Sequence, residues 1–367
     1  MNETYAAVWS IDEHDFPEQG TIRQRLRFAL RYAILAPSGH NGQPWRFRLD
    51  GDVLQVFADR SRALPTIDPL DRELLITCSA TVHLTRTALE HFGYHPQVQL
   101  LPDVNQPDLL ATLRLGERGE LPLDCELFDA ITARHSNRTR YQTRPLPTAQ
   151  LTRLVAAAEE EGAWLESITD KSAIAAAADL IAEGDRTKWR EREFRQELAE
   201  RIIPNRGDRR DGMPGYAFGL PGPLARLAPV VVRHVDLGRA RARSDRALTL
   251  ATPALAIIGT DCDDPSAWMA AGQAMSHVLL RGTAGGLATS FLSQPIEVPE
   301  LRPQLAELLQ HDGNPQLLLR LGYARHTSRA APRRPLRDVI TTSGASPAAQ
   351  TGGPLSTSAN SHTGTSR

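Results

Sequence analysis

Apolar residues recur at helical spacing from residue 22 to residue 35, and arginines fill many of the positions between them. This pattern predicts an amphipathic helix that ends before Pro37, because a residue that precedes a proline is disfavoured in helical conformation. From Trp45 to Leu49 apolar and polar residues alternate, and Asp50-Gly51 then separates this run from a second one over 53–58. Alternation followed by an Asp-Gly pair is typical of a β-hairpin.

A similar succession of patterns occurs twice in the chain. In the first series a helical pattern over 73–91 stops at Gly93 and is followed by strand-like runs at 98–101 and 113–116. In the second, a strand-like run at 255–259 precedes a helical pattern over 270–284 and a strand-like run at 316–322, and 151–164 parallels the first helix and its Trp45. Leu-Arg-Leu-Gly closes both series, at 113–116 and 319–322. We therefore predict an α+β protein built from two degenerate copies of one unit, over 15–120 and 125–340.

Two segments depart from this scheme. Between 183 and 246 the periodicity breaks down: Arg and Glu alternate densely, and a loop rich in Gly, Pro and aromatic residues follows. Because a long irregular insertion in a compact domain is usually functional, we interpret 184–246 as a lid-like insertion with Tyr216 and Phe218 over a bound ligand. Residues 341–367 are dominated by Ser, Thr, Gly, Ala and Pro. Such a segment buries too little apolar surface to fold, which predicts a disordered tail.

Composition and charge exclude several classes of protein. With 41% hydrophobic and 23% charged residues the 367-residue chain can bury a sizeable core, and its net charge of -1 favours neither a nucleic-acid nor a membrane partner. Residues 1–16 lack the apolar core of a signal peptide, and no apolar run approaches the roughly 18 residues of a membrane span. The three cysteines have no zinc spacing, and His91 and His95 lack a third ligand at a recognisable spacing. We expect a cytoplasmic protein without a metal site.

The junction between the first helix and the first strand, over 36–47, is made of small and amide residues. Ser38, Gly39 and Gly42 would let a flat ligand approach the backbone closely. Asn41 and Gln43 each carry a donor and an acceptor, which suits the edge of a pyrimidine-like ring. The same residue types also make ordinary turns, and composition alone favours that interpretation.

A second cluster opens the second copy, where Arg134-His135-Ser136-Asn137-Arg138 stands. Arg134 and Arg138 are four residues apart and would face the same way on a helical turn, with the Ser136 hydroxyl nearby. Two guanidinium groups and a hydroxyl make a phosphate clamp, because charge-assisted bidentate hydrogen bonds are strong and selective. A solvated basic turn is the alternative, and it is favoured when such a cluster is taken alone.

Both segments resemble motifs of one family. Ala-Pro-Ser-Gly-His-Asn-Gly-Gln-Pro-Trp at 36–45 resembles the A-P-S-x-x-N-x-Q-P-W motif of the nitroreductases that use flavin mononucleotide (FMN), and 134–138 resembles their R-x-S-x-R motif. The resemblance implies a nitroreductase-like fold. It also implies ring contacts from Pro37, Ser38, Gly39 and Asn41, and phosphate contacts from Arg134, Ser136, Arg138 and, in the closing basic segment, Arg334.

The closest resemblance is to the Acg-type subgroup, in which two halves are fused in one chain. That resemblance implies flavin contacts within 290–294, with Ser293 and Gln294 as the residues concerned, although Phe291 stands where the family often has a proline. Each motif occurs once, the ring motif in the first half and the phosphate motif in the second. The second, symmetry-related site would need a Pro-Ser motif near 159, where the chain has three glutamates. We therefore expect an intrachain pseudo-dimer with one FMN.

The function that the resemblance implies is hydride transfer from NAD(P)H to FMN and on to a nitro, quinone or similar acceptor. The alternative is an FMN-sequestering protein with a lid closed over the flavin; a scaffold that has lost flavin is a third possibility, which the intact motifs disfavour. No dinucleotide fingerprint is present, so NAD(P)H would bind transiently over the flavin. No catalytic residue is assigned, because His40 and His135 both lie inside binding motifs. Because the chain already contains both halves, a monomer or a homodimer is compatible with it.

Overall fold

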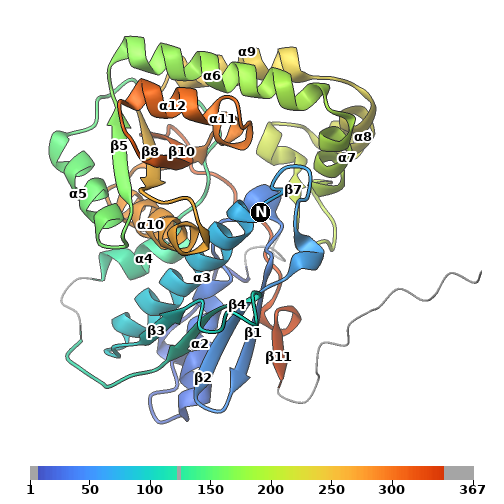
Figure 1. Ribbon diagram of the computed structural model, residues 1–367. Coiled ribbons are helices and arrows are strands. Elements are labelled where there is room, and N and C mark those ends of the chain that lie inside the picture. The colour runs from blue at the N-terminus through green and yellow to red at the C-terminus, as the bar shows by residue number, and fades with distance from the viewer. Residues whose placement is uncertain (1–6, 122–124, 343–367) are drawn as a thin grey trace, which may run out of the picture.

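The computed structural model describes residues 7–121 and 125–342. Figure 1 shows two β-sheets at opposite ends of the molecule, with the long helices α3 (Arg72–His91) and α10 (Pro265–Ala284) between them. The greater part of the predicted tail, 343–367, lies outside the described residues. Residues 341 and 342 belong to strand β11 (Ile340–Thr342).

The first sheet has the strand order β11-β1-β2-β4-β3. Its four sequential strands pair antiparallel, and the predicted hairpin is present, with Asp50 opposite Val53 and Gly51 at a positive φ of 56°. Strand β11 returns from the end of the chain and pairs parallel with β1. The bounds of the four are β1 (Trp45–Asp50), β2 (Val53–Ala58), β3 (Gln97–Leu100) and β4 (Leu109–Arg114).

The second sheet repeats this arrangement. Its antiparallel order β5-β8-β10-β9 matches β1-β2-β4-β3 strand for strand. The helices match too, because α2 (Ile22–Ala33) precedes β1 as α5 (Thr148–Glu159) precedes β5, and α3 follows β2 as α10 follows β8. The predicted α+β fold of two tandem halves is confirmed. The strands are β5 (Trp164–Ile168), β8 (Ala254–Thr260), β9 (Ala288–Phe291) and β10 (Asn314–Gly322).

The two halves share one hydrophobic core, which runs from Leu26 in α2 to Leu321 in β10. At its centre α3 and α10 approach so closely that a Cβ on Gly272 would lie 2.2 Å from the carbonyl oxygen of Ile76. Such a distance is far below van der Waals contact, so only glycine fits there. The sequence sets the ends of these helices as well: Asp264 caps α10, and a capping box of Thr21 and Gln24 begins α2.

The insertion differs from the irregular segment that was predicted for it, because most of it is helical. Dense charge hid the helical periodicity, yet Trp189, Phe194 and Leu198 turn inward and pack with Leu64 and Ile67 of the first half. Figure 1 shows α6 and α9 side by side over the second sheet. The elements are α6 (Lys171–Arg190), α7 (Arg192–Arg201), β6 (Ile202–Ile203), β7 (Met213–Pro214), η4 (Gly215–Phe218), α8 (Gly222–His234) and α9 (Gly238–Leu250).

Short elements complete the fold. In the described part of the chain, no helix combines the length and the apolar character needed to span a membrane. The remaining helices are η1 (Glu13–Asp15), η2 (Gly39–Asn41), η3 (Arg60–Arg62), α4 (Glu126–Ala133), α11 (Gln294–Glu297), α12 (Arg302–Leu309) and η5 (Leu336–Asp338).

Candidate functional site

A cavity of about 1000 Å³ lies between the two halves and below the insertion. Its lining includes the ring motif after α2, the Arg134–Arg138 segment, the end of β9 with α11, the insertion, and the C-terminal segment at 327–333. The structure thus brings together motifs that are about a hundred residues or more apart in the sequence. The predicted site residues that line the cavity are Pro37, Ser38, Gly39, Asn41, Arg134, Ser136, Arg138, Ser293 and Gln294.

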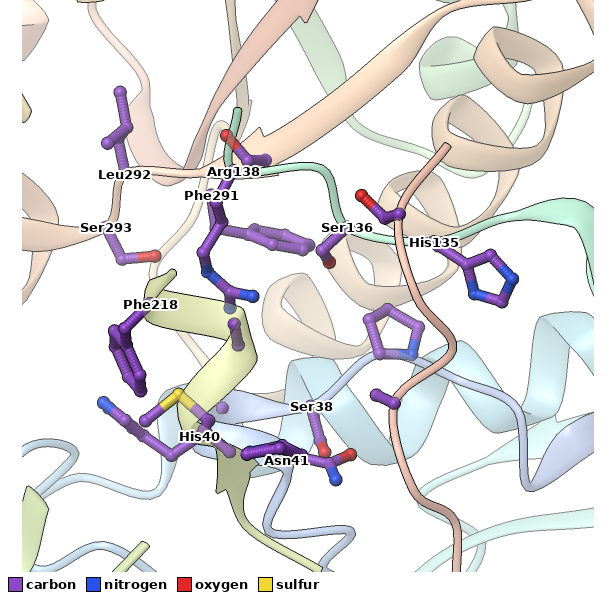
Figure 2. A pocket seen from close by; sticks show the side chains of 18 of the residues that line it. Ser38, His40, Asn41, His135, Ser136, Arg138, Phe218, Phe291, Leu292 and Ser293 are labelled. Atoms are coloured by element: carbon purple, nitrogen blue, oxygen red, sulfur yellow. The ribbon is translucent and has the colours of Figure 1, made fainter. Parts of the chain in front are cut away.

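The ring motif forms a tight turn. His40, Asn41 and Gln43 have positive φ values of 49°, 56° and 51°, which non-glycine residues adopt rarely and Asn and His more readily than most. The backbone N–H of Gln43 donates to Ser38 Oγ at 3.1 Å and closes the turn. This geometry presents Pro37 to Asn41 to the cavity (Figure 2).

The amide of Asn41 is committed to protein partners. Its Nδ2 donates to the carbonyl oxygens of Gly212 at 2.9 Å and Pro332 at 3.0 Å, and its Oδ1 accepts from Arg333 Nη1 at 2.9 Å. Each of its donors and its acceptor therefore has a partner in the chain. Asn41 connects the ring motif to the insertion and to the C-terminal segment.

The Arg134–Arg138 segment is extended, and not the helical turn that the spacing suggested. Helix α4 ends at Ala133, and Ser136 forms a parallel bridge with Thr289 next to the end of the second sheet. In extended backbone, residues two apart face the same side, so Arg134, Ser136 and Arg138 still share one side. The expected grouping is present for a different geometric reason.

Arg138 is the cation most available to a ligand. Its side chain extends into the cavity (Figure 2), and within 7–121 and 125–342 its guanidinium has no hydrogen-bond or ion-pair partner. Burial also lowers its pKa. Among the described residues the Arg134 side chain makes a single hydrogen bond, from Nη2 to the Leu35 carbonyl oxygen at 3.1 Å, so its other N–H groups have no partner there.

The C-terminal basic pair is arranged differently from the prediction. Arg334, the predicted phosphate ligand, is not among the residues that line the cavity; its guanidinium donates to the carbonyl oxygens of Gln43 and Asp338. Its neighbour Arg333 lines the cavity and donates to the carbonyl oxygens of Leu35 and Ala36 as well as to Asn41. The sequence Pro-Arg-Arg-Pro does not indicate which of its two adjacent arginines faces the cavity.

This end of the cavity holds an excess of positive charge. Burial lowers the pKa of Arg134 to about 10 and that of Arg333 to about 9, and in Arg333 the charge of Arg134 adds to the effect. In the described residues none of Arg134, Arg138 and Arg333 has a carboxylate partner. Arg134 and Arg333 are buried, and buried charges without counter-ions are costly, so an anion is the ligand that this end of the cavity fits.

Acidic groups line the cavity as well. Gln294 Nε2 donates to Asp185 at 3.2 Å and to Asp245 at 3.1 Å, while its buried Oε1 has no partner in the part of the chain described. Burial and the neighbouring Asp245 raise the pKa of Asp185 to about 7. Burial lowers the pKa of Lys188, which contacts Glu297, to about 8. Asp185 and Lys188 were missed because they belong to no motif and lie on a helix that was not predicted.

The insertion closes over the cavity. Met213, Tyr216 and Phe218 are among its lining residues. The N–H of Gly212 donates to the Asn41 carbonyl oxygen at 3.1 Å, and Tyr216 donates from its hydroxyl to the Ala330 carbonyl oxygen at 2.8 Å. Tyr216 and Phe218 therefore lie in the part of the cavity lining that the insertion contributes.

Both histidines inside the motifs are neutral. Burial lowers the pKa of His40 to about 3 and that of His135 to about 4, and nearby cations act in the same direction. His40 Nδ1 is buried and, among the described atoms, unpaired. An imidazole with a low pKa and a free nitrogen is suited to hydrogen bonding rather than to donating a proton from its cationic form.

The chain is similar to known proteins over most of its length. The chain is 30% identical over 337 residues to a Mycobacterium tuberculosis protein that carries the provisional name NAD(P)H nitroreductase Rv3131, a match that covers 88% of this chain and 91% of the relative. Among solved structures, the FMN-dependent nitroreductase NfnB of Mycobacterium smegmatis in complex with NADPH is 17% identical, covers 59% of this chain and 97% of its own, and has a TM-score of 0.37. No family model matches the chain.

The chain therefore belongs to the nitroreductase family, as its motifs predicted. Within the family it is similar to Acg of Mycobacterium tuberculosis, with 26% identity over 339 residues that cover 88% of this chain and 97% of Acg.

Proposed function

We propose that this protein binds one FMN per chain in the cavity between its halves and uses it as an NAD(P)H-dependent oxidoreductase. The observation that carries the proposal is the Arg138 guanidinium, which lies in the cavity opposite the small residues of the ring motif and has no hydrogen-bond or ion-pair partner in the part of the chain that the structure describes. Membership of the nitroreductase family supports the same assignment.

The groups that line the cavity fit FMN in charge, size and hydrogen bonding. Arg134, Ser136 and Arg138 would hold the phosphate, because guanidinium forks match its oxygens. Pro37 to Gly39 would lie against the ring, and Gln294 Oε1, an unpaired buried acceptor, would take a hydrogen bond from it. A volume of about 1000 Å³ is at the upper end for a cofactor pocket. FMN bound there would supply the capacity to accept and pass on a hydride.

The second, symmetry-related flavin site is missing in our proposal. Residues 159–161, at and just after the end of α5, where the ring motif follows α2 in the first half, are glutamates. Glu161 is buried and forms two hydrogen bonds with Arg86, at 2.8 and 2.9 Å. A buried carboxylate in this position would repel the electron-rich edge of a second flavin ring.

A storage role is the second candidate function, and the lid favours it. Hydrogen bonds in both directions between Asn41 and Gly212 hold the insertion over the cavity. If this lid stayed closed, FMN would be retained and neither NAD(P)H nor an acceptor would enter. The acceptor in the reductase proposal is a nitro, quinone or similar compound that stacks over the flavin.

Visible absorbance of the purified protein, followed by anaerobic addition of NADPH or NADH, tests the proposal. A bound flavin band that bleaches and returns with a nitroaromatic or quinone acceptor supports the reductase. A flavin band that persists with either nucleotide supports storage. Failure to bind added FMN would overturn both functions.

A further inference from the structure

We propose that His83, His277 and Glu161 form a binding site for a divalent transition-metal ion, of which Zn²⁺ suits the ligands best. The three side chains meet away from the flavin cavity, between the central helices of the two halves. His83 is on α3, His277 is on α10, and Glu161 follows α5. The inference does not rest on the proposed function.

The distances between the ligand atoms match tetrahedral coordination. His83 Nε2 lies 3.6 Å from Glu161 Oε1, and His277 Nδ1 lies 3.5 Å from the same oxygen. Ligand atoms from all three residues lie within 4.8 Å of one another. With metal–ligand bonds of about 2.0–2.1 Å, the corners of a tetrahedron are about 3.4 Å apart. A zinc ion could therefore enter with small movements of the side chains.

The imidazole of His277 is short of partners. Its side chain is 6% exposed, and neither ring nitrogen has a hydrogen-bond partner among the described residues. A buried polar group without a partner is costly. A metal ion bound to Nδ1 would give a partner to one of the two ring nitrogens.

The other two ligands are already oriented by neighbours. His83 Nδ1 lies 3.0 Å from Ser276 Oγ, which fixes the ring and leaves Nε2 toward Glu161. Arg86 binds both oxygens of Glu161, but each carboxylate oxygen has a second lone pair for a metal. Such outer partners are typical of metal sites.

Glu160 could supply a fourth ligand and marks a path by which an ion could enter from the surface. Its carboxylate Oε2 lies 3.7 Å from His277 Nδ1, and its side chain is 66% exposed. Glu160 can therefore reach the ion from the surface, or water can complete the coordination. With the carboxylates of Glu160 and Glu161, the charge of Arg86 and two neutral imidazoles, a bound Zn²⁺ would change the net charge of the cluster from -1 to +1.

The place of this cluster in the fold gives the ion a role. Glu160 and Glu161 stand in the second half where the ring motif stands in the first, so the site occupies the location of the missing flavin motif. Because His83 comes from the first half and the other ligands from the second, a bound ion would cross-link the halves. Zn²⁺ has no redox chemistry, which fits a structural site.

The test is metal binding by the full-length protein, carrying whatever flavin it retains, after dialysis against a chelator. We expect calorimetric titration with Zn²⁺ to give one ion per chain and thermal melting to shift upward. Co²⁺ should give the intense visible bands of tetrahedral coordination. Replacing one ligand in His277→Gln should weaken Zn²⁺ binding by at least about 100-fold, because ligands contribute more than the 10–100-fold of outer partners.

His14→Gln is the matched control, because His14 also contacts a carboxylate, Asp12 at 3.0 Å, but at the surface. It should bind Zn²⁺ like the wild type. The proposal would be overturned if the wild type bound no Zn²⁺, or if Co²⁺ gave only the weak bands of an octahedral surface site. If His277→Gln does not fold, the wild-type stoichiometry and the Co²⁺ spectrum decide alone.

Discussion

Asn41 and Gly212, 171 residues apart, hold each other by hydrogen bonds in both directions: Asn41 Nδ2 donates to the Gly212 carbonyl oxygen at 2.9 Å, and the Gly212 N–H donates to the Asn41 carbonyl oxygen at 3.1 Å. Asn41 belongs to the ring motif and Gly212 to the insertion. We therefore propose that Asn41, which the resemblance assigns to the cofactor, also acts as a latch that holds the insertion closed as a lid. This relationship makes the closed state of the lid testable by one substitution.

Asn41→Asp should make bound FMN dissociate about tenfold faster. Aspartate tolerates the left-handed backbone at this position, but it lacks the N–H groups that bind Gly212 and Pro332. Two lost hydrogen bonds of about 0.5–1.5 kcal/mol each correspond to roughly tenfold or more. Stopped-flow fluorescence measures the release of FMN.

Asn205→Asp is the matched control for the latch. Asn205 Nδ2 donates to the Leu220 carbonyl oxygen at 2.8 Å, so this substitution removes a similar hydrogen bond within the insertion itself. The rate of FMN release should stay within about twofold of the wild-type rate, which corresponds to a change of less than about 0.5 kcal/mol. Equal acceleration by both substitutions would mean that Asn41 does not act as a latch.

Arg138→Ala should weaken FMN binding by about 10–100-fold, because charge-assisted hydrogen bonds contribute about 1.5–3 kcal/mol. Riboflavin, which lacks the phosphate, should bind the variant and the wild type equally. Arg334→Ala should leave FMN affinity unchanged, because the Arg334 guanidinium is committed to Gln43 and Asp338 outside the cavity lining. Fluorescence quenching titrations with both flavins measure the affinities. Equal weakening for the two flavins would place Arg138 at the ring instead.

His40 should make the protein sensitive to mild acid. Its pKa is lowered to about 3 in the folded protein, against about 6.5 in the unfolded chain. The unfolded state therefore binds more protons between these values, and stability is complete above pH 6.5 and lost as the pH falls toward 3. Between pH 7 and pH 5 this one group accounts for about 2 kcal/mol of the free energy of unfolding.

His40→Asn should remove that part of the pH dependence, because asparagine also adopts positive φ and does not titrate. Urea unfolding of the wild type and the variant at pH 7 and pH 5 measures their free energies of unfolding. The wild type should lose about 2 kcal/mol more than the variant. Parallel losses would show that His40 is solvated or protonated in the folded state.

The tandem arrangement could be predicted from the sequence because each half carries its own strand and helix periodicity. The repeated Leu-Arg-Leu-Gly does lie at the ends of equivalent strands, β4 and β10. The helices of the insertion could not be predicted from the sequence, because their buried faces are narrow and are completed by contacts with Leu64 and Ile67 of the first half. The apolar periodicity of a segment shows which of its own residues form a buried face. It does not show that a segment distant in the sequence packs against that face.

The candidate site was predictable only where chemistry lies within a short motif. The spacing of Arg134 and Arg138 predicted that their side chains face the same way. The neighbouring residues did not show that the backbone between them would be extended. His83, Glu161 and His277 come from three separate elements, so no spacing rule could bring them together. That is why the sequence favoured no metal site while the fold assembles a set of ligands.

Two glycines of α10 provide a final test of how the halves are joined. A Cβ on Gly272 would lie 2.2 Å from the Ile76 carbonyl oxygen and 2.7 Å from Ser79 Cβ, both on α3. On Gly282 it would have only ordinary contacts, at 3.9 Å from Leu154 and Leu287. Gly272→Ala should therefore lower the free energy of unfolding by about 1–3 kcal/mol through overpacking. Gly282→Ala should raise it by up to about 1 kcal/mol, because alanine favours helix.

Ile76 also lines the flavin cavity, so the displacement of α3 in Gly272→Ala should weaken FMN binding, while Gly282→Ala should leave it unchanged. Urea unfolding and FMN titration of the two variants measure both effects. Equal stability of the two variants would mean that α3 and α10 can separate at low cost. The halves would then behave as loosely docked units, and a cavity built from both of them could not hold its ligand groups in fixed positions.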